Sequence, residues 1–134
     1  MTVSGDLTVL LVDDDGVWRA ALASWLEREG FRVLGLSRGD GVATTLETKQ
    51  VDAMILDVHL AGLDGLEVLA EVRGRWPALP VMVTTAFGGP ETGDVARRRG
   101  ATCYLDKPFP LAELVTQLRR AVTPPEVKAP RPRG

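Results

Sequence analysis

Short apolar runs alternate along the chain with stretches in which apolar residues recur every three or four positions. The runs cover residues 7–12, 31–36, 53–56, 81–83 and 103–105. Each is too short for a typical helix. The first and fourth are rich in Val and Leu without strict alternation, which is typical of strands buried on both faces. The pattern therefore predicts five short strands.

Helical spacing is clear in three of the intervening stretches and weak in two. The first clear stretch ends at Gly30, the second ends before Pro77, and the third begins after Pro110. Their predicted inward faces are Trp18, Ala21, Leu22, Trp25 and Leu26; Leu66, Leu69, Val72 and Trp76; and Leu111, Leu114, Val115, Leu118 and Val122. In the weak stretches, Val42 and Leu46 face inward after Gly41, and residues 90–99 offer little beyond Val95 and Ala96. We expect this fourth helix to be marginal.

Five strand-then-helix units predict an α/β fold, a doubly wound five-stranded parallel sheet with five helices on its two faces. In such sheets ligands bind beyond the carboxyl ends of the strands, where the strand order reverses. Polar residues that follow an apolar run are therefore the first candidates for a functional site.

Composition and charge narrow the class of protein. The chain has 134 residues, 45% of them apolar and 25% charged, with a net charge of −2, which suits one globular domain and gives no reason to expect direct nucleic acid binding. One cysteine, no signal peptide and no membrane-length apolar segment predict a cytoplasmic protein. We expect a short extension over 1–6, a folded domain over 7–122 and a proline-rich basic tail or linker over 123–134.

The strand ends carry a distinctive set of polar residues. Asp13, Asp14 and Asp15 follow the first strand, Asp57 the third, Thr84 and Thr85 the fourth, and Lys107 the fifth. Carboxylates crowded together with no arginine nearby predict a hard-cation site that suits Mg²⁺. A lysine and a hydroxyl beside that cation would complete a cradle for a phosphoryl group.

Four motifs resemble one known family. They are VDDD at 12–15, LDVHLAGLDG at 56–65, TTA at 84–86 and YLDKPF at 104–109. In this order and spacing they resemble the receiver domains of two-component response regulators, over roughly residues 7–122. The resemblance implies a flavodoxin-like (CheY-like) three-layer sandwich.

The family also implies roles for the residues that match its motifs. Asp57 resembles the phosphoacceptor, which receives a phosphoryl group from a sensor histidine kinase or phosphotransfer protein. Asp14 resembles the direct Mg²⁺ ligand, with Asp13 acting through water and His59 through its backbone carbonyl. Lys107 would bind a phosphoryl oxygen. The domain would be a signalling module that catalyses only its own phosphotransfer and dephosphorylation.

The same resemblance implies a conformational switch. Thr85 is the expected switch hydroxyl, since Ala86 follows it, and Tyr104 is its expected aromatic partner. The bond between Lys107 and Pro108 is expected to be cis. Switching would control a partner or a C-terminal effector domain.

Some residues leave more than one interpretation open. We expect Asp15 to cap the following helix rather than bind metal, and His59 to expose its side chain. Ala61 stands where the family often has proline, which predicts a looser loop around Gly62. The run from Arg97 to Arg99 is either a solvated helix face or, with Asp94, Asp106, Glu113, Arg119 and Arg120, a homodimer face formed by the fourth helix, fifth strand and fifth helix.

Three other functions fit these residues less well than a receiver does. A degenerate receiver that acts without phosphorylation is disfavoured by the complete set of site residues. A haloacid-dehalogenase-like phosphatase would use Asp13 and Asp15, but beyond Lys107 it lacks the paired acids that its metal needs. A flavin-binding flavodoxin would need a phosphate-binding loop after the first strand, and that turn is anionic here.

Overall fold

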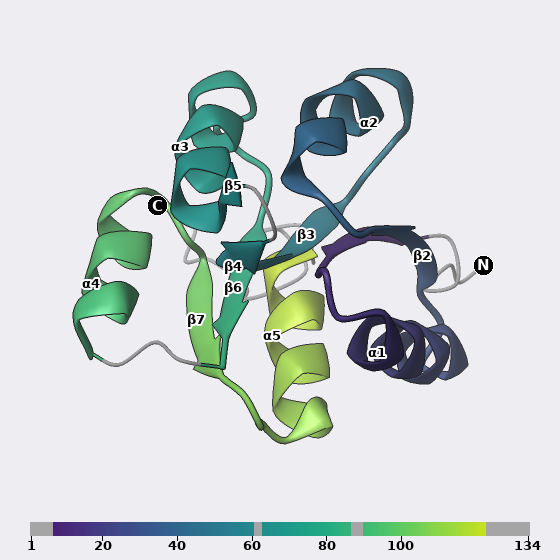
Figure 1. Cartoon of the computed structure of the whole chain (residues 1–134). Helices are drawn as coiled ribbons and strands as arrows, with labels where there is room; N and C mark the ends of the chain where they lie inside the picture. Colours follow the sequence, from purple (N-terminus) through teal and green to yellow (C-terminus); the bar gives the residue numbers. More distant parts are fainter. Residues whose placement is uncertain (1–6, 61–62, 87–89, 123–134) are drawn as a thin grey trace, which may run out of the picture.

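A computed structural model describes residues 7–60, 63–86 and 90–122 of the chain. Its main sheet has five parallel strands in the order β2-β1-β3-β6-β7 (Figure 1). The strands are β1 (Thr8–Val12), β2 (Arg32–Leu36), β3 (Ala53–Asp57), β6 (Val81–Thr85) and β7 (Cys103–Asp106). The predicted doubly wound parallel sheet is confirmed, and the strand order reverses between β1 and β3.

Helices cover both faces of the sheet, as the alternating pattern predicted (Figure 1). They are α1 (Gly16–Arg28), α2 (Val42–Thr48), α3 (Gly65–Arg75), α4 (Pro90–Arg98) and α5 (Leu111–Val122). One core joins α1 and α5 to the sheet, and a second joins α2, α3 and α4 to its opposite face. The chain is therefore a three-layer sandwich. Within the described residues, no helix is long and apolar enough to cross a membrane.

Alternate residues of each central strand feed the two cores. In β1, Val9 and Leu11 pack toward α1 and α5, whereas Leu10 and Val12 pack toward the other three helices. Side chains of a strand point alternately to the two faces of its sheet, so a strand covered on both faces must be apolar at every position. This explains the continuous apolar runs in the sequence.

Three strands extend further than predicted, into the polar residues themselves. Asp57 pairs with Thr84 in the ladder between β3 and β6, and Thr85 pairs with Asp106 in the ladder between β6 and β7. The hydrogen-bonded backbone continues although the side chains change from apolar to polar. Asp57, Thr84 and Thr85 are therefore fixed by the sheet, whereas Asp13 and Lys107 lie one residue beyond a strand.

A second, two-stranded antiparallel ladder was not predicted. It pairs β4 (His59–Leu60) with β5 (Leu63–Asp64), directly after the third strand of the main sheet. The start of α3 is tied to the same segment, because the Gly65 amide donates to the Val58 carbonyl at 2.9 Å. The prediction of a looser loop at Ala61 and Gly62 falls outside the described residues.

The helical predictions hold with one correction. Leu22 and Leu26 of α1 are buried, and Trp18 and Trp25 are half-buried, but Ala21 is exposed. At 100° per residue Ala21 falls at the border of the buried stripe, so it was wrongly placed on the inward face. A short 3₁₀ turn, Gly39–Gly41, also precedes α2 and was not predicted.

Arg73 ties the ends of α3 and α4 together. Its Nε and Nη2 atoms donate to the Gly100 carbonyl at 3.1 and 2.7 Å, just beyond α4. Its Nη1 atom donates to the carbonyls of Trp76 and Pro77 at 3.0 and 2.9 Å. One guanidinium therefore satisfies carbonyls that the two helix ends leave without helical partners. Over residues 91–98, where its burial is described, α4 buries only Gly93 and Ala96.

Candidate functional site

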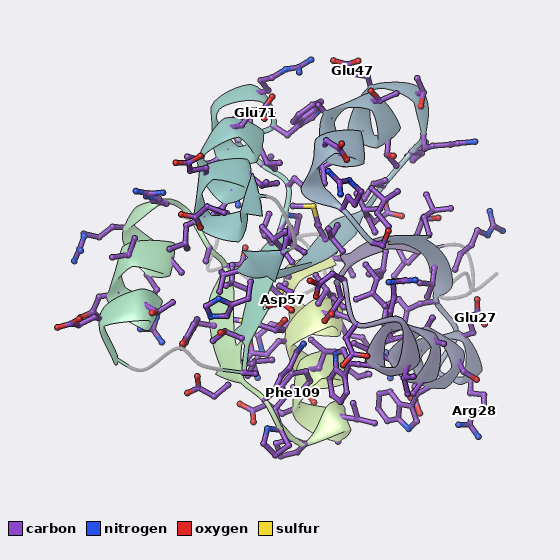
Figure 2. The ribbon with its side chains drawn as sticks, viewed as in Figure 1. Glu27, Arg28, Glu47, Asp57, Glu71 and Phe109 are labelled. Carbon is purple, nitrogen blue, oxygen red and sulfur yellow. The ribbon has the colours of Figure 1, made fainter. Side chains whose placement is uncertain are left out.

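The predicted site residues meet at the carboxyl edge of the central strands. Asp57 ends β3, the middle strand of the sheet, and lies near the centre of the molecule, while the labelled charges of Glu27, Glu47 and Glu71 lie at its periphery (Figure 2). Asp13 follows β1 and Lys107 follows β7. Residues far apart in the sequence are thus brought into direct contact.

Four atoms of Asp13 take part in hydrogen bonds. Its carboxylate accepts from the Asp15 amide at 2.9 Å and from Lys107 Nζ at 2.7 Å. Its amide donates to the Leu36 carbonyl at 3.0 Å, and its carbonyl accepts from Arg19 Nη1 at 2.6 Å. The expectation that no arginine lies nearby was therefore wrong. Arg19 binds the backbone carbonyl of Asp13, however, so the Asp13 carboxylate accepts hydrogen bonds from Lys107 and the Asp15 amide instead.

Lys107 bridges two buried carboxylates. Its Nζ atom lies 2.7 Å from Asp13 Oδ2 and 3.3 Å from Asp57 Oδ2. It also lies 5.2 Å from the centre of the Trp18 ring, a cation–π distance. Burial lowers the pKa of Lys107, but the hydrogen bond and charge of Asp13 and the charge of Asp57 outweigh it and raise that pKa. Lys107 is therefore positively charged at neutral pH.

Asp57 is buried with a partner for each carboxylate oxygen. Oδ1 accepts from the His59 amide at 3.0 Å, and Oδ2 accepts from Lys107. Burial raises the pKa of Asp57 above its ordinary value, and the nearby charge of Asp13 adds to this, while the His59 amide and Lys107 act in the opposite direction. A carboxylate that is costly to keep ionised at a strand end is typical of a functional site.

Asp14 completes a group of three carboxylates. One oxygen each from Asp13, Asp14 and Asp57 lies within 4.8 Å of the others, with Asp14 exposed and the other two buried. Three negative charges face one lysine, so the group carries excess negative charge on its open side. Oxygen ligands with this surplus suit a hard divalent cation such as Mg²⁺. The donor set therefore fits the predicted metal.

Asp15 has the structural role expected of it. Its Oδ1 accepts from the amides of Val17 and Trp18, both at 3.1 Å, which caps the start of α1. It is not among the three clustered carboxylates. The alternative of Asp13 attacking with Asp15 as acid therefore gains no support, because the Asp15 oxygen is turned to the helix.

Thr85 and Tyr104 lie on the same face of the sheet. Thr85 is fully buried, and Tyr104 packs with the core that faces α4. In β6, Val81 and Val83 belong to this core and Met82 to the opposite one, so alternation also directs Thr85 toward α4 and Thr84 away from it. This arrangement agrees with the choice of Thr85. The peptide bond between Lys107 and Pro108 is cis, as expected.

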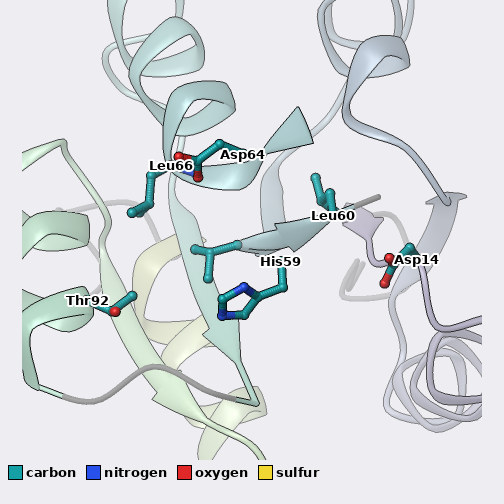
Figure 3. A pocket seen from close by; sticks show the side chains of 7 residues that line it. Asp14, His59, Leu60, Asp64, Leu66 and Thr92 are labelled. Atoms are coloured by element: carbon teal, nitrogen blue, oxygen red, sulfur yellow. The ribbon is translucent and has the colours of Figure 1, made fainter. Parts of the chain in front are cut away.

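A pocket of about 530 Å³ opens beside the acidic group. Its lining includes Asp14, His59, Asp64 and Thr92, with the His59 ring between the Asp14 and Thr92 sides (Figure 3). The His59 side chain is exposed, as expected. Sequence reasoning missed Asp64 and Thr92. Asp64 caps α3 by accepting from the Leu66 amide at 2.9 Å, which its place before the helix could have indicated, but nothing in the sequence points to Thr92.

Comparison with known proteins identifies the family. A model of the response regulator receiver domain matches residues 9–119. The chain belongs to this family. It is 34% identical to the DNA-binding transcriptional regulator NtrC of Salmonella typhimurium over 86% of the chain and 24% of that protein. It is 35% identical to the response regulator protein FleR of Pseudomonas aeruginosa over 84% of the chain and 24% of that protein.

Solved structures agree with the sequence comparison. The receiver domain of NtrX from Brucella abortus is 33% identical, with a TM-score of 0.80 over 85% of this chain and 97% of that one. The chain is thus a receiver domain of a response regulator, a signalling domain that serves as phosphoacceptor in two-component systems. It spans about a quarter of the length of the curated relatives that it matches. Receivers of this family work with histidine kinases and bind Mg²⁺ at their acidic pocket.

Proposed function

We propose that Asp57 is the residue that accepts the phosphoryl group, from a phosphohistidine on a sensor kinase or phosphotransfer protein. The contact that carries the proposal is Lys107 Nζ lying between Asp13 and Asp57, at 2.7 and 3.3 Å. A buried ion pair is a poor source of stability, because desolvation offsets the attraction between its charges. A role in phosphoryl transfer explains better why this ion pair lies at the strand ends, beside an open pocket.

The transfer would form one bond and break one. A carboxylate oxygen of Asp57 attacks phosphorus, the phosphorus–nitrogen bond to the donor imidazole breaks, and its electron pair stays on the ring nitrogen. The product is an acyl phosphate. The His59 amide already donates to Asp57 Oδ1 and holds the carboxylate in place. The Lys107 ammonium would be attracted by the negative charge of the new phosphoryl group and would bind one of its oxygens.

Asp13, Asp14 and Asp57 would hold Mg²⁺, Asp14 directly and Asp13 through water, with the His59 carbonyl as a further ligand. When bound, the ion supplies positive charge that offsets the repulsion between the carboxylates and the phosphoryl oxygens. The surplus of negative charge around Lys107 supports this assignment. Exposure of Asp14 leaves one side of the group open to solvent, where an ion and a phosphodonor can enter.

Phosphorylation would be read through Thr85 and Tyr104. The phosphoryl group adds about −1.5 to −2 charge units and strong hydrogen-bond acceptors. Thr85 would turn to donate to one of them, and the Tyr104 ring would move into the space that it leaves. Tyr104 packs with the core that faces α4, and strand alternation directs Thr85 to the same face, so the change would reach α4 and β7 directly and α5 through β7.

The downstream partner would be an effector domain or a second copy of the chain. NtrC is a DNA-binding regulator by its name, and an effector domain joined through residues 123–134 would suit a chain that spans a quarter of such relatives. A homodimer through α4, β7 and α5 is the other proposed contact. Arg119 contributes little to it, because its guanidinium turns to the Glu29 carbonyl at 2.7 Å. The cytoplasmic location stays a prediction from the sequence.

Intact mass spectrometry tests the central claim. The full chain is incubated with acetyl phosphate and Mg²⁺, with and without a chelator, and the modified peptide is mapped. We expect the mass of one phosphoryl group, dependent on Mg²⁺ and located at Asp57. Modification at another residue would refute the assignment. Catalytic release of phosphate from diverse phosphate esters would instead support a phosphatase.

A further inference from the structure

Three contacts surround the ring and hydroxyl of Tyr104, one with β7 and two with α4, and we call them the Tyr104 clamp. Its hydroxyl donates to Asp106 Oδ1 at 3.0 Å. The Arg97 guanidinium lies 5.9 Å from the ring centre. A Cβ built on Gly93 would lie only 3.0 Å from Tyr104 Cδ2, so the ring packs directly on the helix backbone.

Asp106 occupies a particular place between the two switch residues. It lies two residues after Tyr104 in β7, so both side chains point to the same face of the sheet. It is also the ladder partner of Thr85 in β6. The next residue is Lys107, whose amide donates to the Thr85 carbonyl at 2.8 Å. Asp106 is therefore next to the switch hydroxyl, the switch ring and the site lysine.

We propose that Asp106 is a positioning residue that restrains the switch, by holding the Tyr104 hydroxyl so that the ring stays on Gly93 and Arg97 until Asp57 is phosphorylated. The inference rests on the proposed function and adds a regulatory residue to it. The family resemblance implies roles for Thr85 and Tyr104, whereas it implies none for Asp106.

The clamp opposes the movement that the switch requires. If the Tyr104 ring moves toward the space vacated by Thr85, it leaves Gly93 and Arg97 and its hydroxyl leaves Asp106. A hydrogen bond to a charged acceptor is stronger than a neutral one, but this pair is exposed to solvent. We therefore expect the Asp106 contact to shift the switch equilibrium by a factor of about five, within the range of a population shift between two states.

The resting contact can be tested without phosphorylation. Tyr104 is the one tyrosine of the chain, so its ionisation can be followed alone by the ultraviolet absorbance of the full-length protein. Burial raises the pKa of Tyr104 to about 12, with Asp106 adding to the shift and Arg97 opposing it. Asp106→Asn should lower this pKa, and Asp40→Asn, at an exposed aspartate paired with Arg38, should leave it unchanged. An unchanged pKa in Asp106→Asn would overturn the clamp.

The effect on switching is tested by a double-mutant cycle. Beryllofluoride with Mg²⁺ serves as the acyl-phosphate mimic, and the amide signals of Gly93 and Ala96 report the response of α4. Asp106→Ala should lower the concentration for half-maximal response by a factor of about five. In the Tyr104→Phe background the same substitution should have no effect. An equal effect in both backgrounds would overturn the proposed role.

The two measurements separate the two proposals. If beryllofluoride fails to shift the wild-type signals, the phosphoacceptor function fails, and the switching role of Asp106 fails with it. If the wild type responds but Asp106→Ala behaves like the wild type, the phosphoacceptor function stands and only the role of Asp106 is lost.

Discussion

The ammonium nitrogen of Lys107 lies 2.7 Å from the carboxylate of Asp13, a residue that precedes it by 94 positions in the sequence. Its distance to Asp57 is longer, 3.3 Å. In the unphosphorylated state the lysine is therefore engaged mainly with Asp13. If Asp57 accepts the phosphoryl group as proposed, Lys107 would have to loosen that contact to bind a phosphoryl oxygen, and its contacts would then report whether Asp57 is modified.

Lys107→Ala should affect phosphoryl uptake less than it affects the conformational response to phosphorylation. We expect phosphoryl uptake to persist at a reduced rate, because the carboxylates and the metal site remain, while the response of α4 is blunted. The free energy of unfolding should fall by about 3 kcal/mol, since two buried carboxylates lose their counter-charge. Mass spectrometry and urea unfolding measure the two effects. Lys49→Ala, at an exposed position, is the matched control, and equal losses in both variants would contradict the prediction.

Asp57→Asn should abolish phosphoryl uptake and stabilise the fold in a pH-dependent way. The pKa of Asp57 is raised by burial above its ordinary value of 3.8. The wild type therefore loses stability as the pH rises from that value through the folded-state pKa, because the ionised carboxylate is disfavoured in the folded protein. The asparagine variant escapes this loss.

Urea unfolding at two pH values measures how the stability difference between Asp57→Asn and the wild type changes with pH. The stability gained by Asp57→Asn should be largest at pH 7 and disappear below pH 3.8, where the aspartate is protonated in both states. Asp40→Asn, at an exposed aspartate paired with Arg38, is the control. A gain that is independent of pH would show that charge is not its cause.

Asp14→Asn should weaken Mg²⁺ binding while leaving the fold intact. Removal of one of three clustered carboxylates should raise the dissociation constant roughly tenfold or more. Asp15→Asn removes the neighbouring charge but preserves the helix cap, since asparagine also caps helices well. Calorimetric Mg²⁺ titration of both variants compares them directly. Unchanged affinity in Asp14→Asn would transfer the ligand role to Asp13.

Two glycines of α3 should respond oppositely to alanine. A Cβ on Gly74 would meet nothing within 4 Å, so Gly74→Ala should raise the free energy of unfolding by about 0.5–1 kcal/mol. A Cβ on Gly65 would lie 2.4 Å from Val58 Cα and 2.6 Å from the Asp57 carbonyl. Gly65→Ala should therefore cost about 3 kcal/mol and displace Asp57. Urea unfolding of the two variants measures whether each substitution raises or lowers the free energy of unfolding.

The convergence of Asp13, Asp57 and Lys107 could be predicted from the sequence because it depends only on chain order. Parallel strands place their carboxyl ends on one edge, and the apolar runs show where strands end. The contact between Arg19 and the Asp13 carbonyl could not be predicted in this way. A side chain that binds a backbone carbonyl leaves no spacing or pairing signal in the sequence.

The same limit explains the other errors. Strand ends were placed too early at Asp57 and Thr85 because polarity was taken as the end of a strand, whereas hydrogen bonding between backbones continues past it. The ladder of His59 and Leu60 with Leu63 and Asp64 is too short to show alternation. The Tyr104 clamp depends on how Gly93 and Arg97 of α4 pack on the Tyr104 ring, and this packing is a property of the folded chain.

Arg73 gives α4 one fixed end. Because its guanidinium holds the Gly100 carbonyl, the C-terminal end of α4 is a pivot, and a change at Tyr104 would swing the opposite end. The helix has nine residues, or about 13 Å of length. A rotation of about 10° around the pivot would carry its first turn through about 2 Å, so in the proposed switch α4 would act as a lever for the movement of one ring.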